Sequence, residues 1–141
     1  MNFVLDASVA LLWLAPETNP KGVTYAAATL TALKQSQAVV PSLLALEVAN
    51  VVAKLESTGV VTEADSQRYI ALLSRLNVTV DQATAAHALG DTLNLARRYK
   101  LSAYDAAYLE LALRTGLPLA TLDADLAKAA TTAGGSIFRA H

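Results

Sequence analysis

The chain contains no cysteine. This absence excludes disulfide frameworks, thiol nucleophiles and cysteine-based zinc sites, and it is typical of proteins in a reducing cytosol. Proline and glycine are also scarce, with 4 and 6 among 141 residues, and only 16% of residues are charged against 54% hydrophobic. Such a composition excludes a disordered, collagen-like or low-complexity chain and indicates a compact globular protein.

Long hydrophobic runs and an excess of one charge are absent as well. The longest segments without a charged residue, 22–33 and 35–46, have 12 residues each, short of the roughly 18 that a membrane helix needs. Asp6 interrupts the first apolar residues and no basic segment precedes them, unlike a secretion signal. The balance of 11 Lys and Arg against 12 Asp and Glu excludes a polycationic coat for nucleic acids. We expect a cytoplasmic protein without membrane contact, whose nucleic-acid contacts are local.

Short apolar segments alternate with helical patterns, which predicts an α/β sandwich with a mostly parallel sheet. Thr62 with Asp65 suits a capping box, Ser42 suits an N-cap and Gly116 suits a helix end. The length favours a single domain, residues 1–141. We expect strands at 2–5, 38–40, 77–80, 118–122 and 136–139, and helices at 9–14, 23–37, 42–57, 62–75, 82–99 with a break near Gly90, 102–115 and 123–133.

Familiar catalytic motifs are missing from the sequence. It has no Gly-rich phosphate loop, no dinucleotide fingerprint and no serine in a nucleophile elbow. Of the two histidines, His87 lies in an alanine-rich helical stretch and His141 is the last residue. A single histidine without an orienting partner favours a structural or surface role.

Acidic residues stand in unusual places. Asp6 and Asp123 directly follow predicted strands, where ligands gather at the carboxyl edge of a parallel sheet. Glu47 lies on or beside an apolar helical stripe, and Asp105 is in line with Tyr108 and other apolar residues of its helix. By the same spacing we expect Glu110 and Arg114 to form an ordinary exposed i,i+4 pair.

Each acid also has a structural explanation of about equal weight. Taken together these explanations weaken, because no inward basic residue is evident for all four acids. Converging carboxylates raise one another's pKa unless a divalent cation neutralises them, and oxygen ligands suit Mg²⁺ or Mn²⁺ rather than zinc. The structural alternatives are N-caps for Asp6 and Asp123, a capping box of Ser102 with Asp105, and an ion pair of Glu47 with Lys54.

These acidic blocks resemble those of PIN-domain ribonucleases, and more narrowly those of VapC toxins of bacterial type II toxin–antitoxin modules. The resemblance covers nearly the whole chain in order and length, with residues 4–8, Glu47, 101–108 and 119–126 as its four blocks. It implies a PIN-like three-layer sandwich. It also implies that Asp6, Glu47, Asp105 and Asp123 are the metal-binding catalytic acids, that Ser8 and Thr121 are supporting residues, and that Asp125 is either a further metal candidate or a plain helix-start residue.

The family resemblance further implies Mg²⁺- or Mn²⁺-dependent endonucleolytic cleavage of structured RNA, often tRNA or rRNA, with growth arrest as the outcome. A VapB-like antitoxin would cover the acidic pocket, commonly with a basic side chain, and the toxin would be a homodimer. The candidates for contact with RNA phosphates are Arg97, Arg98, Lys100 and Lys128. A helix C-terminal charge preference and a solvated face explain these cations equally well.

Two other function classes stay open. A PIN-like module could bind RNA or protein without cutting, although such a module would be expected to lack one of the four acids. A phosphoacceptor receiver domain has a similar length and layering, but it needs adjacent acids after the first strand and a lysine after a late strand. Here Asp6 is followed by Ala7, and no lysine accompanies the segment 121–123.

Overall fold

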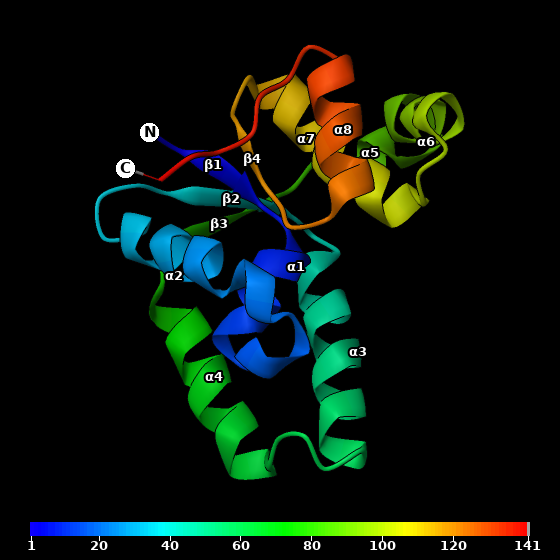
Figure 1. The fold of residues 1–141 in the computed structure, drawn as a ribbon. Helices are drawn as coiled ribbons and strands as arrows, with labels where there is room; N and C mark the ends of the chain where they lie inside the picture. The colour runs from blue at the N-terminus through cyan, green and yellow to red at the C-terminus, as the bar shows by residue number, and fades with distance from the viewer. Residues whose placement is uncertain (141) are drawn as a thin grey trace.

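The structure, a computed structural model, describes residues 1–140, and His141 lies outside the described residues. Its centre is a four-stranded sheet in the order β3-β2-β1-β4, in which all neighbouring strands are parallel. Figure 1 shows this sheet between two groups of helices, which confirms the predicted α/β sandwich. The strands are β1 (Phe3–Leu5), β2 (Ala38–Pro41), β3 (Val78–Asp81) and β4 (Leu119–Ala120).

Alternation along β1 divides the core into two halves. Phe3 and Leu5 are buried in one cluster, which includes Ala26 of helix α2 (Val23–Ala32). Val4 is buried with Tyr108 of helix α7 (Ala103–Thr115) and Leu126 of helix α8 (Ala124–Thr132). Successive side chains of a strand point to opposite faces of its sheet. The continuous apolar run of β1 is therefore buried on both faces, as expected for the centre of a parallel sheet.

The helices form two layers. In Figure 1, α7 and α8 cover one face of the sheet with α5 and α6 beside them, while α1 and α2 cover the other face and α3 and α4 extend from it as a pair. No helix within residues 1–140 is both long and apolar enough to cross a membrane. The helices are α1 (Ala7–Ala10), α2 (Val23–Ala32), α3 (Leu44–Ser57), α4 (Glu63–Arg75), α5 (Thr84–His87), α6 (Leu93–Tyr99), α7 (Ala103–Thr115) and α8 (Ala124–Thr132).

Several local signals act as predicted. Thr62 and Asp65 form the capping box of α4, and Gly116 ends α7 in the left-handed conformation with φ of 69°. The break near Gly90 is also present, as a kinked π-helical segment (Ala88–Thr92) between α5 and α6. Capping boxes and glycine stops depend on side chains and backbone within one turn, so the sequence alone indicates them well.

Other element boundaries were predicted wrongly. Ser42 does not cap α3, whose N-cap Leu43 makes no side-chain hydrogen bond; the Ser42 backbone N–H donates to Thr84 Oγ1 at 3.0 Å instead. The expected strand at 136–139 is reduced to an isolated bridge between Ile137 and Leu119. The helix expected over 23–37 ends at Ala32. For Ser42 and Ile137 the deciding contacts come from distant parts of the chain, which helical and strand patterns do not describe.

Glu110 is buried, contrary to the prediction of an exposed pair. It is 5% exposed, and its carboxylate accepts hydrogen bonds from Arg114 Nε at 2.7 Å and Nη2 at 3.1 Å. The same guanidinium donates to Asp81 Oδ2 at 2.6 Å at the end of β3, and these hydrogen bonds hold the pKa of Asp81 below its ordinary value. The helical pattern missed this because α6 and the π-helical segment before it pack over the outer face of α7, so that both faces are covered.

Replacing Arg114 with leucine should destabilise the fold. The substitution removes the guanidinium and leaves the buried Glu110 with His87 Nδ1, which lies 3.9 Å from Glu110 Oε2. Removal of one partner of a buried pair costs roughly 3–5 kcal/mol. Because the Arg114 side chain is 27% exposed, we expect a loss of about 2 kcal/mol in the free energy of unfolding, measured by urea denaturation. Arg68→Leu is the matched control, since Arg68 pairs with Asp65 at a side-chain exposure of 72%. A loss for Arg114→Leu no larger than for this control would remove the structural role.

Candidate active site

Asp6 follows β1 at the centre of the carboxyl edge of the sheet. The residue is only 4% exposed, and its Oδ2 accepts hydrogen bonds from Ser8 Oγ and Thr121 Oγ1, both at 2.7 Å. Burial raises the pKa of Asp6 even though these two hydrogen bonds act in the opposite direction. Asp6 is also the N-cap residue of α1, but its side chain makes no cap hydrogen bond. The carboxylate is therefore not needed to start the helix.

Ser8 and Thr121 fix the position of this carboxylate. The backbone N–H of Leu122 donates to Ser8 Oγ, and that of Asp123 donates to Thr121 Oγ1, both at 3.0 Å. Each hydroxyl thus accepts from the loop after β4 and donates to Asp6 after β1. Because β1 and β4 are neighbours in the sheet, the two hydroxyls connect the loops on either side of the point where the strand order reverses. In open parallel sheets this point is the usual ligand site.

Asp123 combines a structural role with an open oxygen. Its Oδ1 accepts a hydrogen bond from the Leu126 N–H at 3.0 Å and so caps α8. The N-cap explanation is thus right for Asp123 but wrong for Asp6. Among the hydrogen bonds of residues 1–140, none uses Asp123 Oδ2. Capping therefore leaves this second carboxylate oxygen able to bind another group.

Asp105 and Glu47 are not explained by the structural alternatives. Ser102 Oγ accepts from the Asp105 N–H at 3.1 Å, but the Asp105 carboxylate makes no return bond of the kind that Asp65 makes in α4. Glu47 accepts a hydrogen bond from the Tyr108 hydroxyl at 2.5 Å and forms no ion pair with Lys54 in the described chain.

Tyr108 is a site residue whose role the sequence did not reveal. It is fully buried under the sheet and reaches Glu47 across 61 positions of the chain. Burial and the neighbouring Glu47 raise the pKa of Tyr108, so its hydroxyl stays protonated and acts as a donor. The available signal was its position three residues after Asp105, on the same face of α7.

The four acids lie near enough to repel one another. Burial is the main cause of the raised pKa values of Glu47 and Asp105, and repulsion from Asp6 contributes to both. Asp123 further raises the pKa of Asp6 and of Asp105. Within residues 1–140 no Lys, Arg or His lies within salt-bridge distance of any of these four acids. The structure thus brings them together with their negative charge uncompensated.

The donor set fits a hard divalent cation. No three acids or histidines of the described chain stand close enough together to form a metal site as they lie. The four carboxylates nonetheless offer charged oxygen atoms, partly withdrawn from water and without a basic partner, and such donors suit Mg²⁺ or Mn²⁺. The residues that would hold the ion are Asp6, Glu47, Asp105 and Asp123, with Asp125 at the rim.

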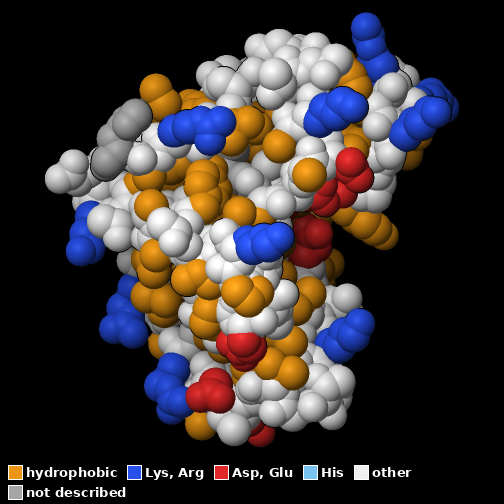
Figure 2. All heavy atoms as spheres, viewed as in Figure 1, with side chains coloured by type: hydrophobic (Ala, Val, Ile, Leu, Met, Phe, Trp, Pro, Cys, Tyr) orange, Lys and Arg blue, Asp and Glu red, His pale blue; other side chains and the backbone are white. Residues whose placement is uncertain are grey.

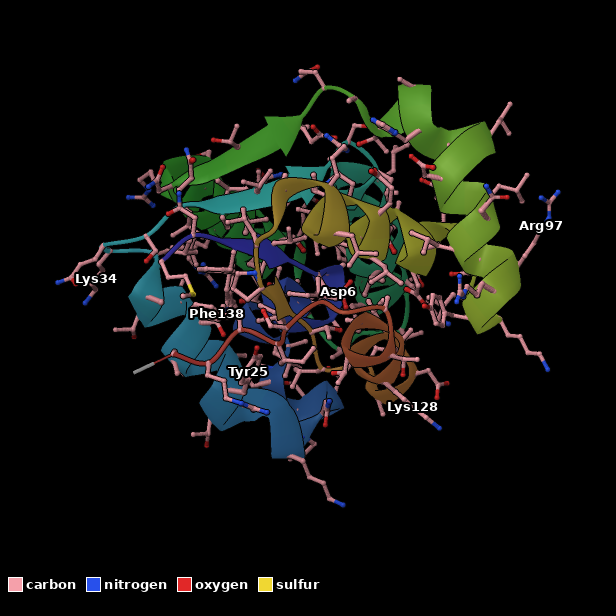
Figure 3. The ribbon with its side chains drawn as sticks, turned by 90° about the horizontal axis from the view of Figure 1, so that it is seen from above. Asp6, Tyr25, Lys34, Arg97, Lys128 and Phe138 are labelled. Carbon is pink, nitrogen blue, oxygen red and sulfur yellow. The ribbon has the colours of Figure 1, made fainter. Side chains whose placement is uncertain are left out.

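The remaining predicted residues surround this centre. Asp125 is exposed in the first turn of α8 and adds to the repulsion that raises the pKa of Asp105. Figure 2 shows carboxylates between the ends of α8 and α3, with Lys and Arg side chains beyond them over α8 and α6. In Figure 3, Asp6 lies centrally, whereas Lys128 and Arg97 project outward from α8 and α6. Arg97 donates to Asn94 on its own helix at 3.2 Å.

The PIN domain family model matches residues 3–131. The chain belongs to the PIN domain family. Within this family it is 30% identical over 129 residues to Ribonuclease VapC3 of Pyrobaculum aerophilum, covering 91% of this chain and 94% of the relative, which supports a VapC-type PIN domain and hence a nuclease.

Two solved structures share the PIN fold of this chain. The crystal structure of PAE2754 from Pyrobaculum aerophilum superposes with a TM-score of 0.68 at 22% identity and covers 97% of this chain and 83% of that one. VapBC2 from Rickettsia felis, solved with a DNA fragment from its promoter, gives a TM-score of 0.61 at 17% identity, covering 87% of this chain and 88% of that one. At these identities the superpositions establish the fold alone.

Neutralising Asp105 should stabilise the metal-free PIN domain. Folding raises the pKa of the Asp105 carboxyl above its ordinary value of 3.8. The stability that this group contributes is therefore present below pH 3.8 and is lost as the pH rises through the pKa of the folded state. Because Asp105 is only half-buried, solvent screens part of the repulsion. We therefore expect Asp105→Asn to melt above the unsubstituted chain by about 2 °C in EDTA near pH 7.5. The difference should vanish as the pH falls toward 3.8.

Asp81→Asn is the control of opposite sign, because the pKa of Asp81 is lowered by Arg114. The stability that the Asp81 carboxylate contributes is present above its ordinary pKa and is lost on acidification. The Asp81→Asn variant should therefore melt below the unsubstituted chain near pH 7.5. Mn²⁺ should raise the melting temperature of the unsubstituted chain more than that of Asp105→Asn. A lower melting temperature for Asp105→Asn, together with no response to Mn²⁺, would contradict a shared metal-binding site.

Proposed function

We propose that this PIN domain is a Mg²⁺- or Mn²⁺-dependent endoribonuclease that acts as the toxin of a VapBC-like pair. The observation that carries this proposal is the gathering of Asp6, Glu47, Asp105 and Asp123 at one sheet edge without a basic partner. The VapC ribonuclease relative supports the substrate class. The proposed targets are structured RNAs, tRNA or rRNA, and the proposed outcome is growth arrest.

The chain's own residues would prepare the site for phosphodiester hydrolysis. Ser8 and Thr121 orient Asp6, and the Tyr108 hydroxyl holds Glu47 by a hydrogen bond. Asp123 is fixed by its place at the start of α8. A bound divalent ion would activate a water molecule and stabilise the phosphate oxyanion. The acids would then need no histidine, and residues 1–140 place none among them.

We extend the proposal to a protein partner, an oligomeric state and a location in the cell. We infer a VapB-like antitoxin, because the uncompensated acids that attract a metal ion also attract an arginine or lysine from another protein. The Rickettsia felis structure that shares this fold is itself that of a VapBC2 complex. We further propose a homodimer, a single PIN-like domain over residues 1–141 and a cytoplasmic site of action. Contacts with RNA phosphates are proposed for Arg97, Arg98, Lys100 and Lys128.

Amide substitutions at the four acids should abolish cleavage without unfolding the protein. Asp6→Asn, Glu47→Gln, Asp105→Asn and Asp123→Asn each remove one ligand charge at nearly constant side-chain size. We expect activity on an RNA substrate with Mn²⁺ to fall at least about 100-fold in each, as metal-assisted activation is lost. Circular dichroism should show a folded chain in every case.

Asp65→Asn is the matched control, since Asp65 is an acid of α4 in a capping box. It should retain full cleavage, although loss of the capping box lowers its melting temperature slightly. Retained activity in one of the four amide variants would remove that residue from the catalytic set. A folded chain that binds RNA but never cuts it would favour the non-catalytic PIN module.

Expression without its partner should arrest growth of the host. A small protein encoded beside it should restore growth and form a stable complex, because a basic side chain in the pocket neutralises the acids. Co-expression and co-purification measure both effects, and Asp6→Asn serves as the non-toxic control. The toxin assignment would fail if the free chain were harmless and captured no neighbouring gene product, even with the fold intact.

A further inference from the structure

A separate cavity lies between the end of α6 and α8. Its volume is about 440 Å³, and its polar lining comes from Arg98, Tyr99 and Lys100 on one side and from Asp125, Lys128 and Thr132 on the other. Three cations therefore face one hollow from two helices that are distant in sequence. Arg97, the fourth cation proposed for RNA contact, does not line it.

The cations of this cavity are available to a ligand. Among residues 1–140, no carboxylate lies within salt-bridge distance of Arg98, Lys100 or Lys128. The Arg98 guanidinium lies over the Tyr99 ring, 5.8 Å from its centroid, which favours an ordered position for that cation. Asp125 is the one acid in the lining, so the cavity carries a net positive charge.

The backbone at Lys100 points to a role for its side chain. Lys100 has φ of 55° and is the one non-glycine residue of the described chain in the left-handed region. This conformation is sterically unfavourable for a residue with a Cβ, and helix ends of this kind commonly use glycine, as α7 does at Gly116. A lysine at this position accepts the steric cost that glycine would avoid, and its side chain supplies a cation to the cavity.

The cavity adjoins the acidic centre through α8. Asp123 caps this helix, Asp125 lies in its first turn and Lys128 follows one turn later. At 1.5 Å per residue, Lys128 is about 7.5 Å along the axis from Asp123. Asp125 belongs to both places, because it lines the cavity and also raises the pKa of Asp105. A chain of phosphates that passes the acids thus meets the three cations next.

We propose that this cavity binds one backbone phosphate of the RNA strand at a fixed distance from the bond that is cut. The inference rests on the proposed ribonuclease function and adds a subsite to it. Arg98 and Lys100 from α6 and Lys128 from α8 surround the phosphate, and Thr132 offers a hydroxyl donor. Held there, the strand is aligned so that a neighbouring phosphodiester lies at the four carboxylates.

Binding of an uncleavable RNA tests the subsite independently of catalysis. The probe is a fluorescein-labelled 2′-O-methyl oligonucleotide, followed by anisotropy over a series of KCl concentrations in EDTA. The variant carries Arg98→Gln, Lys100→Gln and Lys128→Gln. Its matched control carries Lys54→Gln, Arg68→Gln and Arg75→Gln on α3 and α4, which removes the same charge elsewhere. We expect about tenfold weaker binding and a salt slope smaller by about 0.7 for the cavity variant alone.

A scan with methylphosphonate linkages then locates the phosphate. One neutral linkage at a single position should weaken binding by the unsubstituted chain but have no effect on the cavity variant. Equal losses for both triple variants, or no such position, would overturn the subsite. So would unchanged RNA binding with a weakened partner complex, which would assign the cavity to a protein. Because neither measurement requires cleavage, loss of the subsite and loss of the proposed nuclease activity are separate results.

Discussion

The buried charge of Asp6 is the constraint on which the site depends. The carboxylate stands at the end of the central strand, where the hydroxyl groups of Ser8 and Thr121 donate to it and partly compensate its burial. Ser8 lies in α1 directly after β1, and Thr121 lies in the loop after β4, so the pairing of these strands sets their spacing. Any shift of β4 along β1 would separate Thr121 from Asp6 and leave the charge without its donors. The register of β1 and β4 therefore also fixes the geometry of the site.

The buried and half-buried acids of the chain fall into two groups, those paired with a cation and those without one. Glu110 and Asp81 share the guanidinium of Arg114, which lowers the pKa of Asp81 and fastens β3 to α7. Asp6 and Asp105 have no cation, and their pKa values are raised. The first arrangement stabilises the fold at neutral pH, whereas the second destabilises it. The unpaired acids are therefore the place where the proposed metal ion would stabilise the chain most.

The sequence predicted the positions of the acids better than it predicted the residues that contact them. Asp6 and Asp123 follow strands, and Asp105 lies on an inward helix face, so strand order and helical spacing suffice to bring them to one edge. The same spacing failed for Glu110, because it describes one buried face and α7 is covered on both. It also could not show that Tyr108 binds Glu47, since that contact depends on how α3 crosses α7. Distant contacts of this kind require the folded structure.

Two neighbouring surfaces of opposite charge suit a single polyanionic substrate. The acids alone would repel RNA, because each of its phosphates is negative, and a metal ion bound among them would offset this repulsion only locally. The cations at the end of α6 and on α8 line a cavity together with Asp125, so in the proposed complex they would compensate the repulsion that the acids create. The two surfaces also bear on how the proposed antitoxin would inhibit. A basic side chain among the acids would take the place of the metal ion and stop cleavage, but it would leave the cation cavity free to bind RNA. To block RNA binding as well, the partner would have to cover α8.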